Sequence, residues 1–150
     1  QSTESALKAR EAGILDAGTV IVSSPFSRAL RTAEMVKEVL GQSADILLEE
    51  DLRERWFGEL EGTSSENYKR VWSEDEQGIL PSSYGAESAK DVQKRMYSVI
   101  ERFENEREGQ VILLVSHGDS IKILETMFRG VEPEFHRAAK QQMVCHQYLL

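Results

Sequence analysis

The sequence has a single cysteine, Cys145, and no apolar run near the roughly 20 residues of a membrane-spanning helix. One cysteine excludes an internal disulfide framework and fits a reducing compartment, so we expect a cytoplasmic protein with no membrane partner. Because Cys145 lies between Val144 and His146 near an apolar stretch, we interpret it as a buried structural thiol.

Positive charge is also scarce. The chain has 18 Lys and Arg against 26 Asp and Glu, a formal net charge of −8. A nucleic-acid backbone needs a basic face, so we expect no nucleic-acid partner. A small anionic substrate stays compatible with this charge if arginines gather at one place. At 150 residues the chain has the length of one domain with a proper core.

Segments with helical periodicity alternate with short runs typical of strands. Helices are predicted over 2–12, 27–40, 88–107 and 120–128, with short ones at 66–72 and from 133. The helix at 66–72 lies in a long polar region, 63–86. Strands are predicted over 19–22, 46–48, 110–115 and 143–150. This alternation favours a three-layer α/β/α sandwich with a mostly parallel sheet, in which ligands bind beyond the carboxyl ends of the strands.

The first strand end that this rule selects is followed by Arg28. Residues 19–22 run into the turn 23–27, where Ser27 is placed to cap the next helix. Arg28 then lies in the first helical turn, where a cation is unfavourable because of the helix dipole. A bound anion would reverse that penalty. The residue pattern leaves two interpretations open, an anion ligand and a solvated surface arginine.

The second strand end is followed by His117 and Gly118. His117 comes directly after the apolar run 111–115, and a helix is predicted to start soon after it. Free backbone N–H groups then follow the histidine, and Gly118 lets a ligand approach the backbone closely. A histidine can also be a structural residue at such a turn, but this context favours a functional one.

A third segment, 51–62, mixes charged residues with Trp56, Phe57 and two glycines. Glu54 is its candidate for chemistry. Near a phosphate dianion, like charge disfavours the ionised carboxyl group, so Glu54 could donate a proton to a leaving group. Arg53 or Arg55 could pair with Glu54 or reach a substrate.

Together these residues resemble the histidine phosphatase superfamily, the phosphoglycerate mutase-like group. The matching pieces appear in the family's order: SSPFSRALRTAE at 23–34, LRERWFGELEG at 52–62, GAES at 85–88 and VSHG at 115–118. The resemblance extends over essentially the whole chain. It implies a phosphoglycerate mutase-like sandwich and a small phosphorylated substrate, with no metal or other cofactor.

The implied chemistry is phosphoryl transfer through a phosphohistidine, which water then hydrolyses. Arg28 matches an arginine of the phosphate pocket, Glu54 the proton donor, and His117 the second histidine, which holds the phosphoryl group. Gly118 would leave its backbone free near the same oxygens. Arg55 matches a position that contacts substrate in some members, and the GAES piece, with Glu87, is expected to organise a loop.

The family's attacking histidine lies in an Arg-His-Gly piece at the end of its first strand, and this sequence contains no such piece. We expect the chain to be one histidine phosphatase-like domain over 1–150 that begins after that strand and ends inside the last one. The alternative is a complete protein that lacks its nucleophile, a non-catalytic phosphate-binding or scaffold protein.

The remaining histidines and aromatic residues are assigned less chemistry. His136 is interpreted as a surface helix histidine. Cys145 and His146 would point to opposite faces of a strand, so no metal site is expected. Tyr68, Trp72 and Tyr84 either cover the substrate or pack the polar region against the domain.

The polar region 63–86 also bears on the choice between phosphatase and mutase. Family mutases carry a longer insertion with paired arginines here, whereas the basic residues of 63–84 are Lys69 and Arg70 alone. This favours a phosphatase, with phosphoglycerate mutase-type transfer as the alternative. The particular substrate and the oligomeric state are left open.

Overall fold

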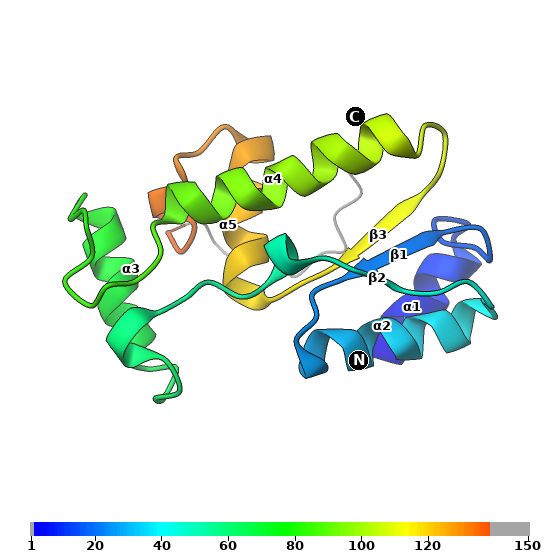
Figure 1. Cartoon of the computed structure of the whole chain (residues 1–150), viewed down its shortest axis with the longest axis horizontal. Helices are drawn as coiled ribbons and strands as arrows, with labels where there is room; N and C mark the ends of the chain where they lie inside the picture. Colours follow the sequence, from blue (N-terminus) through cyan, green and yellow to red (C-terminus); the bar gives the residue numbers. More distant parts are fainter. Residues whose placement is uncertain (1, 139–150) are drawn as a thin grey trace.

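The computed structural model describes residues 2–138 (Figure 1). Its helices are α1 (Ser2–Glu11), α2 (Ser27–Leu40), α3 (Tyr68–Glu76), α4 (Ala89–Glu106) and α5 (Gly118–Arg129). Its strands are β1 (Val20–Ser23), β2 (Leu47–Leu48) and β3 (Ile112–Val115), and short 3-10 turns are η1 (Glu50–Leu52), η2 (Gly58–Leu60) and η3 (Pro133–Phe135). These elements match the predicted ones closely. The predicted strand over 143–150 lies outside the described residues.

The three described strands form one parallel sheet in the order β2-β1-β3. Val20 lies opposite Ile112, and Ser23 opposite Val115, so β1 and β3 end at the same edge. Ser23 also pairs with Leu48 of β2. The short β-branched run of β1 fits a strand buried on both faces, which a sheet between two helical layers requires.

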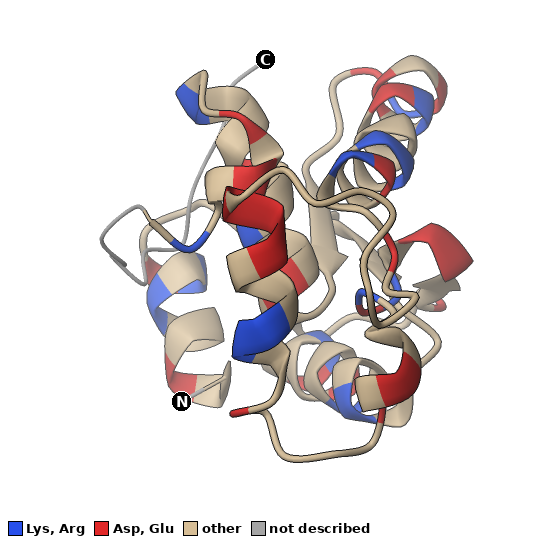
Figure 2. Cartoon of the chain, turned by 90° about the vertical axis from the view of Figure 1, so that its left-hand side faces the viewer, with Lys and Arg blue, Asp and Glu red and all other residues tan. Residues whose placement is uncertain are grey.

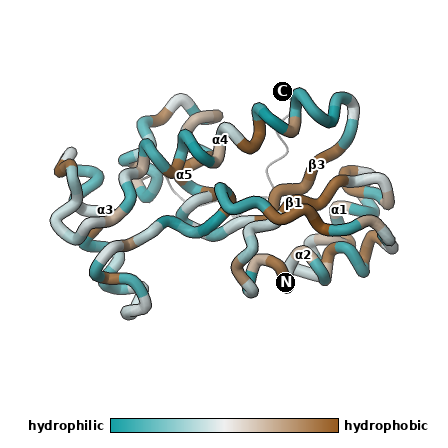
Figure 3. Tube along the Cα trace, viewed as in Figure 1, coloured by the Kyte–Doolittle hydropathy of each residue, from teal (hydrophilic) through white to brown (hydrophobic). Residues whose placement is uncertain are grey.

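Two apolar clusters hold helices on opposite faces of this sheet. Ile21 packs with residues of α1 and α2, whereas the next residue, Val22, packs with residues of α4 and α5. Successive strand side chains point to opposite faces, so one short strand serves both cores. Figure 1 shows α4 above the strands and α1 and α2 below, and Figure 3 shows the hydrophobic strands between them. The predicted α/β/α sandwich is confirmed.

The N-cap of α2 and the starts of α3 and α5 differ from their predictions, and α3 begins at Tyr68 rather than at residue 66. The N-cap of α2 is Phe26, with no side-chain cap, and Ser27 is already helical, so the predicted Ser27 cap is wrong. The helix α5 begins at Gly118 with His117 as N-cap, two residues before its predicted start. In contrast, Ser88 caps α4 by accepting a hydrogen bond from the Asp91 N–H.

The helix α3 lies apart from the sheet, at the end of the molecule that Figure 2 turns toward the viewer. It extends four residues past its predicted end at Trp72, through an acidic stretch. Glu74 and Asp75 are buried there because tertiary partners satisfy them. Glu74 accepts hydrogen bonds from the Ser82 hydroxyl and the Ser83 N–H, and Asp75 pairs with Arg55. Among residues 2–138, no helix has the length and apolarity to cross a membrane.

At Gly58 the backbone segment before α3 packs closely against the segment after it. Its φ is +60°, and a Cβ there would lie 1.9 Å from the Tyr84 carbonyl oxygen. The neighbouring Glu59 N–H donates to that same oxygen at 2.9 Å, which fixes the close approach. A side chain at this position would therefore push two backbone segments apart.

We predict that Gly58→Ala destabilises the fold far more than Gly62→Ala. Gly62 has a similar φ of +74° but nothing within 4 Å of an added Cβ, so it isolates the backbone strain of about 1–2 kcal/mol. Urea unfolding should give a loss for Gly58→Ala that exceeds the loss for Gly62→Ala by at least about 1 kcal/mol. Equal losses would contradict the close packing of these segments.

Candidate functional site

Arg28 and His117 meet at the edge of the sheet where β1 and β3 end. The Ser24 N–H donates to the Val115 carbonyl oxygen at 2.9 Å, which continues the ladder past the last paired residues. The Arg28 Nε then donates to the His117 Nδ1 at 2.9 Å, and the His117 Nε2 lies 2.8 Å from the Ser24 Oγ. The structure thus brings together the two residues that the strand-end rule selected.

The partners of His117 fix its tautomer. Arginine has donors alone, so the Nδ1 that accepts from Arg28 carries no proton, and Nε2 is the protonated nitrogen. Burial, followed by the positive charges of Arg28 and Arg95, lowers the pKa of His117 to about 4. His117 is therefore a neutral imidazole at neutral pH.

Glu54 lies at the same helix N-terminus. Its Oε1 accepts hydrogen bonds from the Ser120 N–H at 3.2 Å, the Ser120 hydroxyl at 3.2 Å and the Arg55 N–H at 3.1 Å. Ser120 belongs to the first turn of α5, three residues after His117. Among the described residues, nothing donates to the Glu54 Oε2, so one carboxylate oxygen is held and the other is available.

Gly118 is the first residue of α5, directly between His117 and the turn that holds Glu54. No heavy atom lies within 4 Å of the position that a Cβ would take there. Its backbone N–H is among the first of the helix, where the dipole favours a negative ligand. Position and open space both agree with close backbone approach by an anion.

The structure places Arg55 in a different environment. Its side chain is fully buried, and its two terminal nitrogens donate to the Asp75 carboxylate at 2.6 and 2.8 Å. Its Nε donates to the Glu87 carbonyl oxygen at 2.8 Å. No hydrogen bond or ion pair within residues 2–138 joins it to Arg28 or His117. Contact of Arg55 with substrate stays a prediction.

The interpretation of His136 as a surface residue is wrong. It is 5% exposed, its Nδ1 lies 2.9 Å from the Pro133 carbonyl oxygen, and its Nε2 lies 3.2 Å from the Asp119 Oδ1. Both of these partner oxygens can accept a hydrogen bond from the ring. The local sequence gave no signal for this because Asp119 comes from another element, α5.

Asp119 is a buried residue beside the candidate site, and sequence reasoning missed it. It follows Gly118 in the first turn of α5 and is 3% exposed. Its carboxylate accepts from His136, from Arg137 and, at 3.3 Å, from the Trp72 Nε1. Burial alone would raise the pKa of Asp119, but the His136 hydrogen bond and the charges of His136, Arg137 and Arg55 outweigh it and lower the pKa to about 2. Asp119 thereby ties α3 and η3 to the first turn of α5.

The aromatic residues of α3 make packing contacts. Tyr68 stacks on Phe57 with ring centroids 3.8 Å apart, and the Arg137 guanidinium lies 3.7 Å from the centroid of the Trp72 ring. Of the two interpretations given to these residues, the contacts support packing of the polar region against the domain. Within residues 2–138, no group of three or more His, Cys, Asp or Glu is arranged to hold a metal ion. Cys145 and His146 lie outside the described residues.

We predict that the His117 ring titrates with a pKa of about 4 in NMR spectra of the folded chain. Since the folded pKa lies below the ordinary 6.5, the unfolded chain binds the extra proton first, and His117 costs stability as pH falls from about 6.5 to 4. Arg28→Met should raise this pKa, because a positive charge is removed, while Arg31→Met should leave it unchanged. Titration of wild-type His117 near 6.5 would contradict the placement.

We predict that Asp75→Asn destabilises the chain by about 3–5 kcal/mol, because it leaves the buried Arg55 guanidinium without its main charged partner. The control is Glu66→Gln, which removes the exposed Lys69–Glu66 pair and should change stability by less than about 1 kcal/mol. Urea unfolding measures both. A small loss for Asp75→Asn would indicate that Arg55 is free to leave the pair.

Comparison with known proteins identifies the family of the chain. Residues 5–149 match the family model of the histidine phosphatase superfamily, branch 1. The 2,3-bisphosphoglycerate-dependent phosphoglycerate mutase of Methylobacterium sp. is 31% identical over 123 residues, 77% of this chain and 59% of the relative. The uncharacterized phosphatase PhoE of Bacillus subtilis is 30% identical over 115 residues, 77% of this chain and 55% of the relative. The chain thus spans less than two thirds of these relatives' length.

Among solved structures, the mycobacterial glucosyl-3-phosphoglycerate phosphatase superposes with a TM-score of 0.72 over 93% of this chain and 70% of that chain. The sequences are 21% identical, so this likeness supports the phosphoglycerate mutase-like fold alone. The family match, the fold and the order of the four sequence pieces agree: the chain belongs to the histidine phosphatase superfamily.

Proposed function

We propose that this protein, in its full length, hydrolyses phosphomonoesters through a phosphohistidine intermediate. One observation carries the proposal: Arg28, His117 and Glu54 converge on the N-terminus of α5 from three separate segments. That place combines a guanidinium, a ring nitrogen and free helix N–H groups with a carboxylate that has one oxygen available. These are the groups that a transferred phosphoryl group and its leaving oxygen need.

The reaction then proceeds in two steps. The nucleophilic histidine, which we place upstream of Gln1 in an Arg-His-Gly segment at the end of a first strand, attacks phosphorus and forms a P–N bond. The P–O bond to the leaving group breaks as Glu54 gives its proton to the leaving oxygen. Water then attacks phosphorus, Glu54 takes back a proton, and the P–N bond breaks to release inorganic phosphate.

His117 holds the phosphoryl group in this scheme. It is neutral in the free protein because positive neighbours and burial lower its pKa. A phosphoryl dianion between Arg28 and His117 would raise that pKa, so the ring can take up a proton and donate to a phosphoryl oxygen. The substrate is a small phosphorylated molecule. We propose that the protein acts in the cytoplasm and needs no metal.

Phosphoglycerate mutase-type transfer is the second candidate, because curated relatives at 31 and 34% identity carry that name. The segment between η2 and α4 supports hydrolysis instead. Its two basic residues, Lys69 and Arg70, are adjacent on α3, and the exposed Lys69 is engaged with Glu66. A non-catalytic phosphate-binding role is the outcome if the full-length protein lacks a nucleophile.

The test is turnover of p-nitrophenyl phosphate by the full-length protein. Arg28→Ala and His117→Ala should each lower kcat/KM by about 100-fold or more, since each removes a group that stabilises the transferred phosphoryl group. Arg31→Ala is the matched control. Arg31 lies one turn further along α2, its side chain is 77% exposed, and its ion-pair partner is Glu34. It should keep near-normal activity.

Interconversion of phosphoglycerates, assayed in parallel, separates a mutase from a phosphatase. A full-length protein that carries the Arg-His-Gly segment and yet turns over no common phosphomonoester would overturn the proposal. Near-normal activity in Arg28→Ala or His117→Ala would remove that residue from the site.

A further inference from the structure

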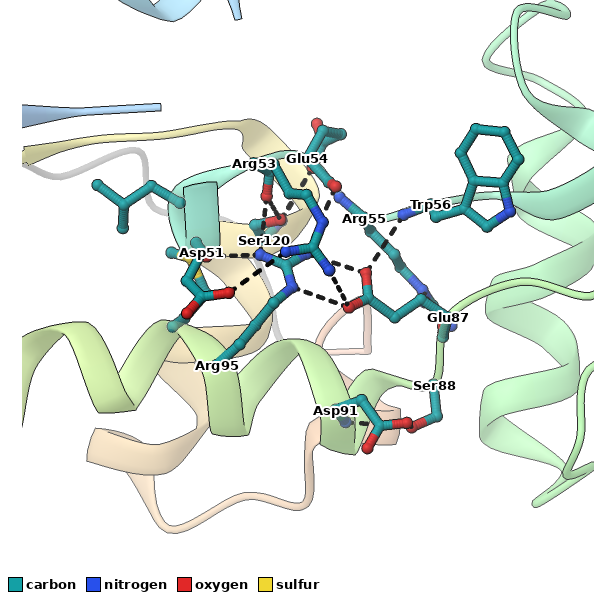
Figure 4. Close-up of polar contacts among 12 residues, drawn as sticks. Asp51, Arg53, Glu54, Arg55, Trp56, Glu87, Ser88, Asp91, Arg95 and Ser120 are labelled. Carbon is teal, nitrogen blue, oxygen red and sulfur yellow. Dashed lines mark hydrogen bonds and ion pairs between the residues drawn. The ribbon is translucent and has the colours of Figure 1, made fainter. Parts of the chain in front are cut away.

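Arg95 of α4 reaches the backbone around Glu54 (Figure 4). Its side chain is 9% exposed, and one terminal nitrogen donates to the carbonyl oxygens of Asp51 at 2.6 Å and Arg53 at 2.9 Å. The other terminal nitrogen lies 3.4 Å from the carbonyl oxygen of Glu54 itself. A single side chain from a distant helix therefore holds three backbone carbonyl groups of the segment that carries the proposed acid.

Glu87 binds the Arg95 guanidinium from the other side, and we call the Arg95–Glu87 pair the brace. Its two carboxylate oxygens accept from the Arg95 Nε at 2.8 Å and from an Arg95 terminal nitrogen at 3.0 Å. The Glu87 N–H also donates to the Trp56 carbonyl oxygen at 2.9 Å. Burial by itself would raise the pKa of Glu87, but the Arg95 hydrogen bonds and charge outweigh it, so the carboxylate stays ionised. The expected role of the GAES piece in loop organisation is confirmed.

The brace fixes the backbone orientation of 53–56, and this orientation decides which side chains of the segment are buried and which are accessible. Arg95 and Glu87 hold the backbone at Arg53, Glu54 and Trp56, on both sides of the Glu54 Cα. In the segment so held, Arg55 and Phe57 are buried, while Glu54 is partly accessible and Trp56 is exposed. With the backbone in this orientation, the Glu54 carboxylate reaches Ser120 at the start of α5.

We propose that Arg95 is a positioning residue for Glu54, and that it sets the activity of this carboxyl group as the acid for the leaving oxygen. The proposal rests on the proposed function. Arginine suits the task because its planar guanidinium presents five donors in a fixed fork, whereas lysine is a single flexible charge. The Arg95 charge also reaches the rest of the site, since it contributes to the low pKa of His117.

The experiment compares two aryl esters that differ in their leaving group. p-Nitrophenolate leaves readily without a proton, while phenolate depends on the acid. In the full-length protein, Arg95→Gln should lower kcat/KM for phenyl phosphate by about 100-fold and for p-nitrophenyl phosphate by less than about tenfold. Glu54→Gln should show the same selective loss. Adding Arg95→Gln to Glu54→Gln should cost little more, because both changes act through one group.

Lys94→Gln is the matched control. It removes the same charge from the neighbouring, exposed position of α4 and should leave the ratio of the two esters unchanged. Arg95→Lys should restore part of the lost ratio. If circular dichroism shows that Arg95→Gln does not fold, Arg95→Lys is tested in its place. The measured quantity is again the ratio of kcat/KM for the two esters, because a loss of folded protein lowers both values equally and leaves their ratio unchanged.

Equal losses on both esters in Arg95→Gln would overturn the positioning role while the phosphatase proposal stands. If Arg95→Lys is used instead, a ratio of the two esters equal to that of the wild type would overturn it in the same way. A wild-type protein that hydrolyses neither ester would overturn the proposed function, and the role of Arg95 toward an acid would fall with it. A selective loss in Glu54→Gln without one in Arg95→Gln would show that other contacts position the acid.

Discussion

The parallel register of β1 with β3 is the constraint on which the site depends. Because Ser23 lies opposite Val115, the two strands end level, and the chain leaves both at one edge of the sheet. Arg28 and His117, distant in sequence, then come within hydrogen-bonding distance. A shift of the register by one residue would reverse the faces of β3 and break both the core and this contact.

The two buried histidines near the start of α5 have partners of opposite kinds. His117 accepts a hydrogen bond from Arg28, and burial together with the charges of Arg28 and Arg95 keeps its ring neutral by lowering its pKa to about 4. His136 has an acceptor at each ring nitrogen and stands beside the ionised Asp119. The first arrangement suits a ligand site, whereas the second ties η3 to the first turn of α5.

The sequence predicted much of this from local pattern. The β-branched run of β1, the spacing of apolar residues along α2 and α4 and the strand-end rule were enough to select Arg28 and His117. Asp119, His136 and Arg95 were missed because each gains its role from partners on other elements. Arg95 in particular stands among charged helix residues and resembles a solvated one. The end of α3 was misplaced for the same reason, since its acidic residues are paired through tertiary contacts.

The central claim is that one phosphoryl group is held jointly by Arg28 and His117 with Glu54 on its leaving side. A crystal structure of the full-length protein with orthovanadate, an analogue of the transferred group, tests it most directly. The account predicts vanadium oxygens within hydrogen-bonding distance of the Arg28 guanidinium, a His117 ring nitrogen and the Gly118 N–H, and a Glu54 carboxylate oxygen facing one axial oxygen. Vanadate bound elsewhere, with the Arg28–His117 hydrogen bond still intact, would contradict it.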